Sequence, residues 1–389
     1  MPRTPIATRQ PIERAILAGV EVRGIHGALS LDDSLEELTQ LANTAGAKVV
    51  GAVRQRLQHP VRTYLGGGKL EELSSLVQQH QATTVILDDE LSPTQQKILE
   101  DATHIKVIDR TALILDIFAR RAQTREGRLQ VELAQHEYLL PRLAGQWSHL
   151  ERLGGGIGTR GPGESQIETD RRLIRNRIQK LKEQLEEVRR HRALYRERRK
   201  QQRLPVLSLV GYTNAGKSTL FNLLGKADTL VQDRLFATLD PVTRRCQFHS
   251  GHPFLLTDTV GFIQKLPTAL VAAFRATLEE LADADVLVHV IDISHPNAIE
   301  QREVVDQTLQ AMGLAEKRVV LAYNKIDRLA PDKEAVDQVV ADLRPRLVVP
   351  GLPAAFVSAA KGWGMPRLLE TLEAALEGVS RPTNVIEVG

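Results

Sequence analysis

Residues 204–225 read LPVLSLVGYTNAGKSTLFNLLG, which is an apolar run, then a short loop, then a segment with helical spacing. The loop from Gly211 to Ser218 matches the pattern G-x-x-x-x-G-K-[ST]. Glycines in such a loop let successive backbone N–H groups surround a triphosphate, while Lys217 neutralises its β and γ oxygens and the Ser218 hydroxyl reaches Mg²⁺. This stretch therefore predicts a strand, a P-loop and a helix, and with them a nucleoside-triphosphate site.

Two later segments indicate which nucleotide the loop binds. A predicted strand at 254–257 ends in Asp258-Thr259-Val260-Gly261, with an acidic group for the Mg²⁺ side and a glycine for the γ-phosphate. Another, at 319–323, runs into Asn324-Lys325-Ile326-Asp327. The Asp327 carboxylate can accept hydrogen bonds from N1–H and the 2-amino group of guanine, whereas adenine would leave it unpaired. These residues predict specificity for guanine.

Two further segments complete the predicted domain. A strand at 355–357 leads to Ser358-Ala359-Ala360, which we expect to contact the guanine O6 through its backbone. The first switch must lie within 225–250, where Thr238 in the segment Phe236–Asp240 is the candidate second Mg²⁺ ligand. Because open α/β sheets bind ligands at the carboxyl ends of their strands, motifs in this order at strand ends predict a GTPase domain at 204–376.

Phe262 follows the Asp258–Gly261 motif, where many GTPases place a glutamine that orients the attacking water. An apolar ring cannot do this, so we expect low intrinsic turnover, with the arrangement completed by a partner or an ion. Arg160 acting as an intramolecular arginine finger is a further idea, but nothing in the sequence places it near the phosphates.

Residues 14–116 alternate short β-rich runs with amphipathic stretches. The runs AILAGVEV, AKVVGAV, TTVILDD and IKVIDR predict strands, and helical segments with caps at Asp32 and Ser92 separate them. This alternation predicts a parallel α/β domain at 1–120, with a structural or docking role. Gly66–Lys69 could hold an anion at the start of a helix, but it lacks the outer glycine of a second P-loop.

Residues 121–203 predict a helical hairpin. GRLQVELAQHEYLLPRL has one helical pattern, and a longer one extends over 171–203. The longer one carries the apolar spacing of a coiled-coil seam, for which the first helix is the nearest partner; the seam residues are Ile174, Ile178, Leu181, Leu185, Val188 and Tyr195. The glycine-rich loop at 154–164 is either a flexible connector or a loop that approaches RNA or phosphate, and composition leaves both readings open.

The longer helical segment concentrates positive charge. Residues 171–203 contain 14 Lys and Arg against 4 Asp and Glu, a net of +10, although the whole chain carries only +3. Charged faces of coiled coils are often merely solvated, but here the signs are unbalanced, which favours contact with nucleic-acid phosphates. The candidate RNA contacts are Arg160, Arg171, Arg172, Arg175 and Arg177.

Composition excludes several classes of protein. The 389 residues suffice for two or three domains, and 42% hydrophobic with 25% charged residues is ordinary for a globular chain. A single cysteine, Cys246, excludes a disulfide framework and a zinc site built from cysteine pairs. No apolar run approaches the length of about 18 residues that a transmembrane helix needs, and the N-terminus lacks the apolar core of a signal peptide. We therefore expect a cytoplasmic protein without a transmembrane segment. Peripheral association with membranes remains an open alternative.

The motifs, together with GGGIGTRGPGES-x-x-E-x-D-R-R at 154–172, resemble those of HflX-type GTPases of the translation-factor-related class over nearly the whole chain. The resemblance implies catalytic roles for Lys217, Thr238 and Gly261, and a K⁺ ligand at Asn214, which could otherwise simply cap the loop. It implies Mg²⁺ on Ser218 and Thr238. The GTP contacts that it implies are Gly211, Tyr212, Thr213, Asn214, Ala215, Gly216, Lys217, Ser218, Phe236, Ala237, Thr238, Leu239, Asp240, Asp258, Thr259, Val260, Gly261, Asn324, Lys325, Ile326, Asp327, Ser358, Ala359 and Ala360.

The same resemblance implies partners. We expect GTP and GDP, the large (50S) ribosomal subunit and its rRNA, no DNA, and a monomeric protein that splits or rescues stalled ribosomes under stress such as heat. Some HflX-type relatives carry an extra C-terminal domain, whereas here only a short tail at 377–389 follows the predicted GTPase domain.

Three alternatives remain open at this point. The first is an NTP-dependent RNA remodeller or helicase, which would need a complete second P-loop. The second is a large-subunit assembly factor, which would share the ribosomal partner. The third is a scaffold that binds a protein through the coiled coil, which would not need the positive charge of residues 171–203.

Overall fold

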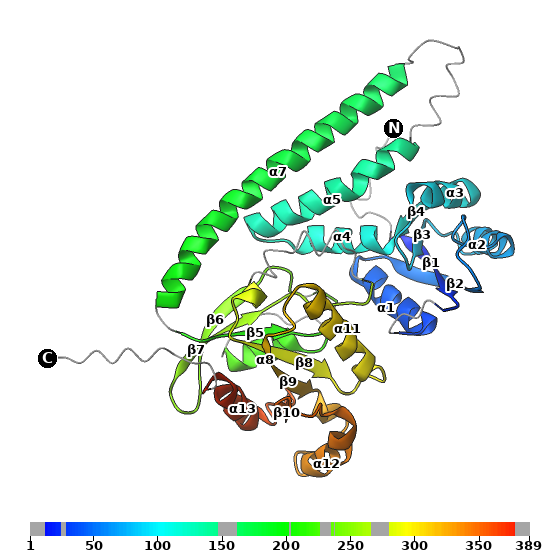
Figure 1. Cartoon of the computed structure of the whole chain (residues 1–389). Helices are drawn as coiled ribbons and strands as arrows, with labels where there is room; N and C mark the ends of the chain where they lie inside the picture. The colour runs from blue at the N-terminus through cyan, green and yellow to red at the C-terminus, as the bar shows by residue number, and fades with distance from the viewer. Residues whose placement is uncertain are drawn as a thin grey trace, which may run out of the picture. The chain divides into compact units, whose positions relative to one another are not determined.

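The computed structural model describes residues 12–24, 29–146, 162–201, 204–225, 235–236, 238–265 and 280–377 (Figure 1). The chain divides into two compact units. One comprises Met1–Arg120, Arg128–Leu185 and Lys265–Ala273, and the other comprises Arg121–Gly127, Glu186–Gln264 and Phe274–Gly389. Among the described residues, none of the helices combines the length and the apolar character needed to cross a bilayer.

The first unit begins with a four-stranded sheet in the order β2-β1-β3-β4, in which every pairing is parallel. Its strands are β1 (Arg14–Val22), β2 (Lys48–Leu57), β3 (Thr84–Leu87) and β4 (Lys106–Asp109). The helices that alternate with them are α1 (Leu31–Thr44), α2 (Gly67–Gln79), α3 (Pro93–Thr103) and α4 (Arg110–Arg121). The predicted parallel α/β domain is confirmed, and α4 is an element that the sequence analysis did not include.

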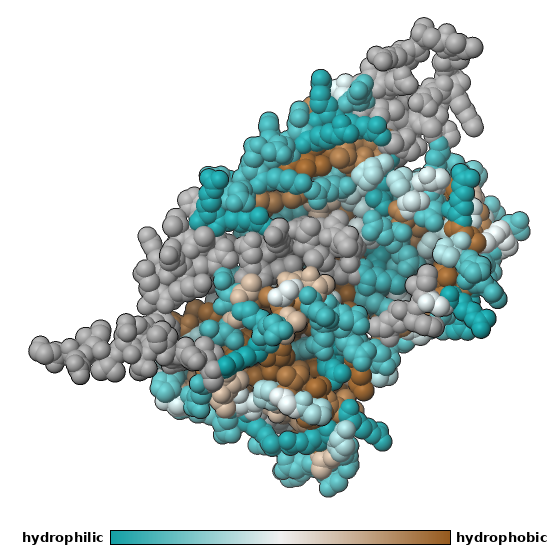
Figure 2. Space-filling model, in the orientation of Figure 1, coloured by the Kyte–Doolittle hydropathy of each residue, from teal (hydrophilic) through white to brown (hydrophobic). Residues whose placement is uncertain are grey.

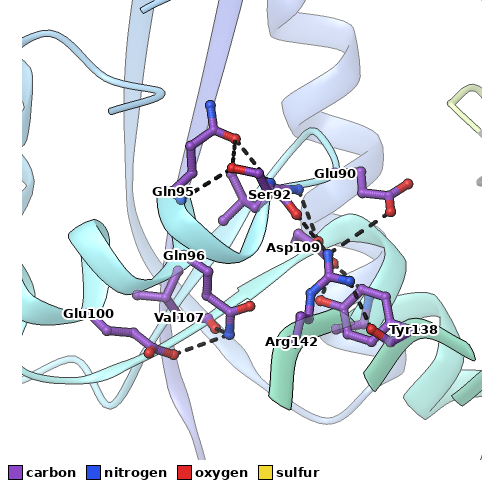
Figure 3. Close-up of polar contacts among 11 residues, drawn as sticks. Glu90, Ser92, Gln95, Gln96, Glu100, Val107, Asp109, Tyr138 and Arg142 are labelled. Carbon is purple, nitrogen blue, oxygen red and sulfur yellow. Dashed lines mark hydrogen bonds and ion pairs between the residues drawn. The ribbon is translucent and has the colours of Figure 1, made fainter. Parts of the chain in front are cut away.

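The two predicted helix caps have different outcomes. Ser92 caps α3 as predicted: its hydroxyl accepts from the Gln95 N–H while the Gln95 side chain accepts from the Ser92 N–H, which completes a capping box (Figure 3). The cap predicted at Asp32 is wrong. Ser30 caps α1 instead, with its hydroxyl accepting from the Asp33 N–H, and Asp32 forms an exposed ion pair with Arg54.

A buried ion cluster lies at the start of α4. Arg110 is 1% exposed and donates two hydrogen bonds to Glu37 at 2.7 and 2.8 Å, and it lies 3.6 Å from Asp88. Burial raises the pKa of the Asp88 carboxyl, but Arg110, Lys265 and the Ser34 hydroxyl outweigh burial and hold that pKa below its usual value. The charge of Arg110 therefore compensates two carboxylates that have little access to water.

Replacing Arg110 with methionine is expected to lower the free energy of unfolding of this unit by about 3–5 kcal/mol, because two buried carboxylates lose their counter-charge. Asp88 has a depressed pKa, so its contribution is present above about pH 3.8 and is lost as the pH falls through the lower folded value. Urea unfolding at pH 7 measures the loss. The matched control is Arg54→Met, which breaks an ion pair exposed by 54% and 72% and should cost less than about 1 kcal/mol.

Asp109, at the end of β4, anchors the next helix, α5 (Arg125–Gln146), to the sheet. Its carboxylate accepts from the Tyr138 hydroxyl at 2.9 Å, from Arg142 at 3.0 Å and from the Leu91 N–H at 3.0 Å (Figure 3). Arg142 also lies over the Tyr138 ring, 3.5 Å from its centroid, and donates to the Leu91 carbonyl. Burial beside Asp109 raises the pKa of Tyr138, so the phenol stays protonated and keeps donating.

The long helix α7 (Pro162–Gln201) follows α5 and begins earlier than the predicted start at Arg171. Two ion pairs join the helices, Arg177–Glu132 at 2.6 Å and Lys182–Glu137 at 2.9 Å. The predicted seam faces inward: Leu181 is fully buried, and Ile174, Ile178, Leu185 and Val188 are half-buried. The hairpin is therefore confirmed over these residues; the side chain of Tyr195 and the glycine-rich segment before Pro162 lie outside the described residues.

The second unit contains a six-stranded sheet in the order β10-β9-β8-β5-β7-β6, parallel except for β6. The strands are β5 (Val206–Val210), β6 (Val242–Gln247), β7 (Pro253–Asp258), β8 (Val286–Asp292), β9 (Arg318–Asn324) and β10 (Ala354–Phe356). The named helices among the described residues are α8 (Lys217–Leu224), α11 (Ala298–Ala311), α12 (Val336–Leu347) and α13 (Met365–Glu377), with a 3₁₀ turn η1 at Ile326–Arg328. The predicted strands β5, β7, β9 and β10 are confirmed, and the P-loop joins β5 to α8.

Candidate functional site

The P-loop closes around its own lysine. Lys217 is the first residue of α8, it is 6% exposed, and its ammonium donates to the carbonyl oxygens of Gly211 at 3.1 Å and Tyr212 at 2.9 Å. Gly216 precedes it with φ +95°, and a Cβ there would overlap the Asn324 side-chain amide. Burial lowers the pKa of Lys217 from 10.5 to about 8, because its surroundings compensate the ammonium charge only in part. An anion such as a phosphate beside Lys217 would favour the ammonium form.

Three side-chain oxygen atoms meet beside Lys217. One Asp258 oxygen accepts from the Ser218 hydroxyl at 2.7 Å and from the Thr238 hydroxyl at 2.8 Å, and the two hydroxyls lie 2.8 Å apart. The other Asp258 oxygen is buried and has no hydrogen-bond partner among the described residues. Burial raises the pKa of Asp258, although Lys217 and the two hydroxyls oppose that shift. Two hydroxyls and an incompletely paired carboxylate form the hard oxygen set that Mg²⁺ prefers, so these residues fit that ion.

Asn324 connects three of the predicted motifs. Its side-chain amide donates to the carbonyl of Ala215 in the P-loop at 2.8 Å and accepts from the N–H of Ala359 at 2.9 Å. The next residue, Lys325, forms a 2.7 Å ion pair with Asp292 at the end of β8. Asp327 lies on η1 and is half-buried, so its carboxylate remains accessible to a base. The sheet therefore brings the P-loop, after β5, and the two segments predicted to recognise the base, after β9 and β10, to the same edge of the sheet, as expected.

Phe262 is built into the wall of the P-loop. Its N–H donates to the carbonyl of Gly211 at 3.1 Å, its carbonyl accepts from the N–H of Thr213 at 2.7 Å, and its side chain is 2% exposed. The ring is thus buried in the protein and offers no polar atom to a water molecule.

Gly261 occupies a position with no room for a side chain. A Cβ there would lie 2.9 Å from the Lys217 ammonium nitrogen and 2.9 Å from two atoms of Thr213, one of them the backbone Cα. Because the Cα cannot move without the P-loop, Gly261→Ala is expected to lower GTP turnover roughly 10- to 100-fold while the protein remains folded, as measured by turnover and circular dichroism.

The matched control for this change is Gly68→Ala in α2, where a Cβ meets nothing within 4 Å. Turnover of Gly261→Ala equal to that of Gly68→Ala would show that the close approach of Gly261 to Lys217 has no part in the reaction.

Other predicted site residues have different surroundings. The Thr259 hydroxyl donates to the carbonyl of Leu209, so it holds neighbouring strands together. Phe236, Leu239 and Val260 are buried. Tyr212 is buried, its hydroxyl accepting from the Gln264 N–H at 2.8 Å. Of the remaining predicted residues, Ser358 is buried and Ala360 and Asn214 are exposed, whereas Ala237 and Arg160 lie outside the described residues.

The sequence analysis did not include two contacts. The pairing of Lys325 with Asp292 was missed because the run VLVHVID was not assigned as a strand, although its valine and isoleucine residues would have indicated one. The second contact is made by Asp240, which the resemblance predicted to contact GTP: its carboxylate accepts from the N–H groups of Gln123 and Thr124.

The segment Gly66–Lys69 does not form a second P-loop. Gly66 is the N-cap of α2 and donates its N–H to Gln55 at 2.9 Å, while the Lys69 ammonium forms a 2.7 Å ion pair with Glu72. The lysine is thus occupied by a neighbour on its own helix.

The largely parallel sheet, the P-loop that wraps Lys217 and the segments predicted to recognise guanine at the strand ends together indicate a P-loop GTPase. Three family models match the chain: "GTP-binding GTPase N-terminal" at 32–119, "GTP-binding GTPase Middle Region" at 121–199 and "50S ribosome-binding GTPase" at 206–325. Among curated proteins, "GTPase HflX" of Caldanaerobacter subterraneus subsp. tengcongensis is 50% identical over 365 residues, 94% of this chain and 81% of that protein. "GTPase HflX" of Escherichia coli is 43% identical over 93% of this chain and 84% of that protein.

The chain belongs to the HflX family of GTPases, enzymes that bind and hydrolyse GTP. Among solved structures it is similar to a complex of SsGBP with GDP, with 25% identity and a TM-score of 0.49 over 94% of this chain and 99% of that one. It is also similar to a GTP-binding protein from Sulfolobus solfataricus in complex with GDP, with 25% identity and a TM-score of 0.46 over 95% of this chain and 100% of that one.

Proposed function

We propose that the protein is a GTP-switched factor of the large (50S) ribosomal subunit, which stimulates its GTP hydrolysis, and that its task is to split or rescue stalled ribosomes under stress. The observation that carries the proposal is the match of residues 206–325 to a family described as 50S ribosome-binding GTPases. The ribosomal partner in turn points to the cytoplasm.

The residues proposed to hold GTP are those at the strand ends. The backbone of Gly211–Ser218 wraps the phosphates, Lys217 neutralises the β and γ oxygens, and Asp327 accepts from guanine. Asn324 is proposed to stabilise the base site, because its side-chain amide forms hydrogen bonds with both Ala215 in the P-loop and Ala359. Ser218 and Thr238, with Asp258 beside them, are proposed to hold Mg²⁺, which would neutralise charge that develops on the phosphates.

Asn214 is proposed as a K⁺ ligand. It is exposed on the P-loop, and its backbone is in the left-handed region at φ 62°, which asparagine tolerates better than most residues. A monovalent cation beside the transferring phosphoryl group would supply positive charge in place of an arginine finger.

A surface of α7 is proposed to contact rRNA. Arg172 and Arg175 are exposed and Arg171 is half-buried, and Figure 2 shows hydrophilic side chains along α7 beside a hydrophobic stripe. Arg177, in contrast, is held by Glu132 at 2.6 Å, so its charge is already partly compensated. The structure thus favours Arg172 and Arg175 over Arg177 among the candidates. The proposed division of the chain has three parts. The ribosome-docking part comprises residues 1–120 and 121–203, the GTPase domain comprises 204–376, and a tail comprises 377–389.

Sedimentation of the full-length chain with purified 50S subunits tests the proposal. We expect binding with a non-hydrolysable GTP analogue, weaker binding with GDP, and a steep loss as salt rises from 50 to 200 mM. The double variant Arg172→Glu/Arg175→Glu should bind 50S subunits about tenfold more weakly than the unmodified chain. The salt dependence of its binding should also be shallower.

The control variant is Arg367→Glu, which changes the charge at an exposed position on α13. Equal 50S binding by all variants would remove α7 from the interface. Absence of nucleotide-dependent binding to 50S by the unmodified chain would contradict the proposed function itself.

A further inference from the structure

Asp240 ends the Phe236–Asp240 segment and binds the start of α5. One carboxylate oxygen accepts from the N–H groups of Gln123 at 2.8 Å and Thr124 at 2.9 Å, and the other accepts from the Thr124 hydroxyl at 2.5 Å. The Thr124 hydroxyl in turn accepts from the N–H of Gly127 at 2.9 Å, as a helix N-cap does. These residues belong to the same compact unit.

The contact leaves no space between the carboxylate and the Cα of Gly127. A Cβ added to Gly127 would overlap one oxygen of Asp240 and would approach its carboxyl carbon to 3.2 Å. Helices lose stability when an interior residue is glycine rather than alanine, so propensity gives no reason for Gly127 in the first turn. The close approach of the Asp240 carboxylate gives one.

Asp240 is only two residues from Thr238. Two residues of extended chain span at most about 7 Å, and the residue between them, Leu239, is 4% exposed and fixed in the core. The Thr238 hydroxyl is the one that lies 2.8 Å from both Asp258 and Ser218. Any displacement of Asp240 is therefore transmitted to Thr238 with little slack.

We propose that Asp240 is a positioning residue for the GTP-bound site: by accepting hydrogen bonds from the N–H groups of Gln123 and Thr124, which immediately precede α5, it fixes Thr238 where it can bind Mg²⁺. The inference rests on the proposed role of Thr238 as an Mg²⁺ ligand. This role of Asp240 differs from that of a purely structural helix cap. A structural cap would affect the stability of α5 but would leave the Mg²⁺ dependence of nucleotide binding unchanged.

The test is an Mg²⁺ titration of the binding of a fluorescent, non-hydrolysable GTP analogue to the full-length chain, with GDP binding measured in parallel. Asp240→Ala and Gly127→Ala should each raise the half-maximal Mg²⁺ concentration about tenfold for the GTP analogue, because charge-assisted hydrogen bonds that locate Thr238 are lost. GDP affinity should stay within about twofold, since the threonine of this switch is ordered by the γ-phosphate.

Three further variants make the outcome specific. Thr124→Val should raise the Mg²⁺ requirement as Gly127→Ala does, whereas Thr124→Ser, which keeps the hydroxyl, should retain the normal requirement. Gly68→Ala is the glycine-to-alanine control, because its Cβ would meet nothing within 4 Å. Thr238→Val separates the two levels of the argument. If Thr238→Val raises the Mg²⁺ requirement and the Asp240 and Gly127 variants do not, the positioning role is wrong; if Thr238→Val has no effect, the proposed Mg²⁺ ligand is wrong.

Hydrogen exchange gives a readout that does not depend on activity. Coupling between two sites is reciprocal, so the GTP analogue with Mg²⁺ should slow exchange of the Gln123 and Thr124 amides relative to GDP. Thr238→Val should abolish that difference. Identical exchange of these amides in both nucleotide states of the unmodified chain would overturn the inference.

Discussion

Replacing Lys217 with methionine is expected to lower GTP affinity on the order of 100-fold and to reduce turnover to background, because the phosphates lose a buried ammonium and its charge-assisted hydrogen bonds. Methionine keeps the length of the side chain, so packing changes little. Titration with a fluorescent GTP analogue measures the affinity, and phosphate release measures the turnover.

The same substitution is expected to stabilise the nucleotide-free protein. Burial lowers the pKa of Lys217 to about 8, so at pH 7 the folded protein holds a charge that its surroundings disfavour. At about 1.36 kcal/mol per pKa unit, removal of that charge is worth up to about 3 kcal/mol. A depressed lysine pKa penalises the folded state below about pH 8, and the penalty disappears as the pH rises from about 8 to 10.5. The advantage of Lys217→Met should therefore shrink over that window.

Lys333→Met is the matched control, because Lys333 is exposed in the same unit. It should change neither GTP affinity nor stability by a measurable amount. A variant at Lys217 that bound GTP as tightly as Lys333→Met would contradict the assignment of the P-loop.

Replacing Asp327 with asparagine is expected to exchange guanine specificity for xanthine specificity. The carboxylate accepts from N1–H and the 2-amino group of guanine, whereas xanthine carries a carbonyl oxygen at position 2, which repels a carboxylate. An asparagine side chain offers one acceptor to N1–H and one donor to that carbonyl. GTP affinity should fall on the order of 1,000-fold, and xanthosine triphosphate should become the better ligand.

Competition between GTP, xanthosine triphosphate and ATP for the fluorescent analogue measures this change. Asp337→Asn, on the exposed face of α12, is the control and should retain the preference for GTP. Unchanged selectivity of Asp327→Asn would place the base elsewhere on the protein.

Much of the nucleotide site could be predicted from the sequence, because its parts are short segments attached to strands. The P-loop and the segment ending at Asp327 each carry their chemistry within a few residues, and the carboxyl ends of parallel strands bring them together. The strand β6 was missed because it is an antiparallel edge strand that contains polar residues such as the half-buried Arg244 and the exposed Arg245, and so lacks the apolar pattern of a buried strand.

Contacts between distant residues could not be predicted in this way. Asp240 and Thr124 are 116 residues apart, and Asn324 lies 109 residues from Ala215, so no local sequence pattern predicts either hydrogen bond. Ser30 was overlooked as the cap of α1 because the next polar residue in line, Asp32, is also a good cap on composition alone. Only three-dimensional structure distinguishes between two candidates so close in sequence.

The absence of a water-orienting side chain at Phe262 bears directly on the proposed partner. Two backbone hydrogen bonds join Phe262 to the P-loop, and its ring is buried and carries no polar atom that could orient a water molecule. Under the proposed function, catalysis is completed from outside this position, and the proposed contributors are K⁺ near Asn214 and the ribosomal subunit.

The most direct test of the central claim is the rate of GTP hydrolysis by the full-length chain with and without purified 50S subunits, in K⁺ and again in Na⁺, with ATP as the control nucleotide. We predict a rise on the order of 100-fold or more with 50S subunits and GTP, larger in K⁺ than in Na⁺, and none with ATP. A GTPase rate that 50S subunits leave unchanged, together with ATP hydrolysis stimulated by free RNA, would contradict the account and favour an RNA remodeller.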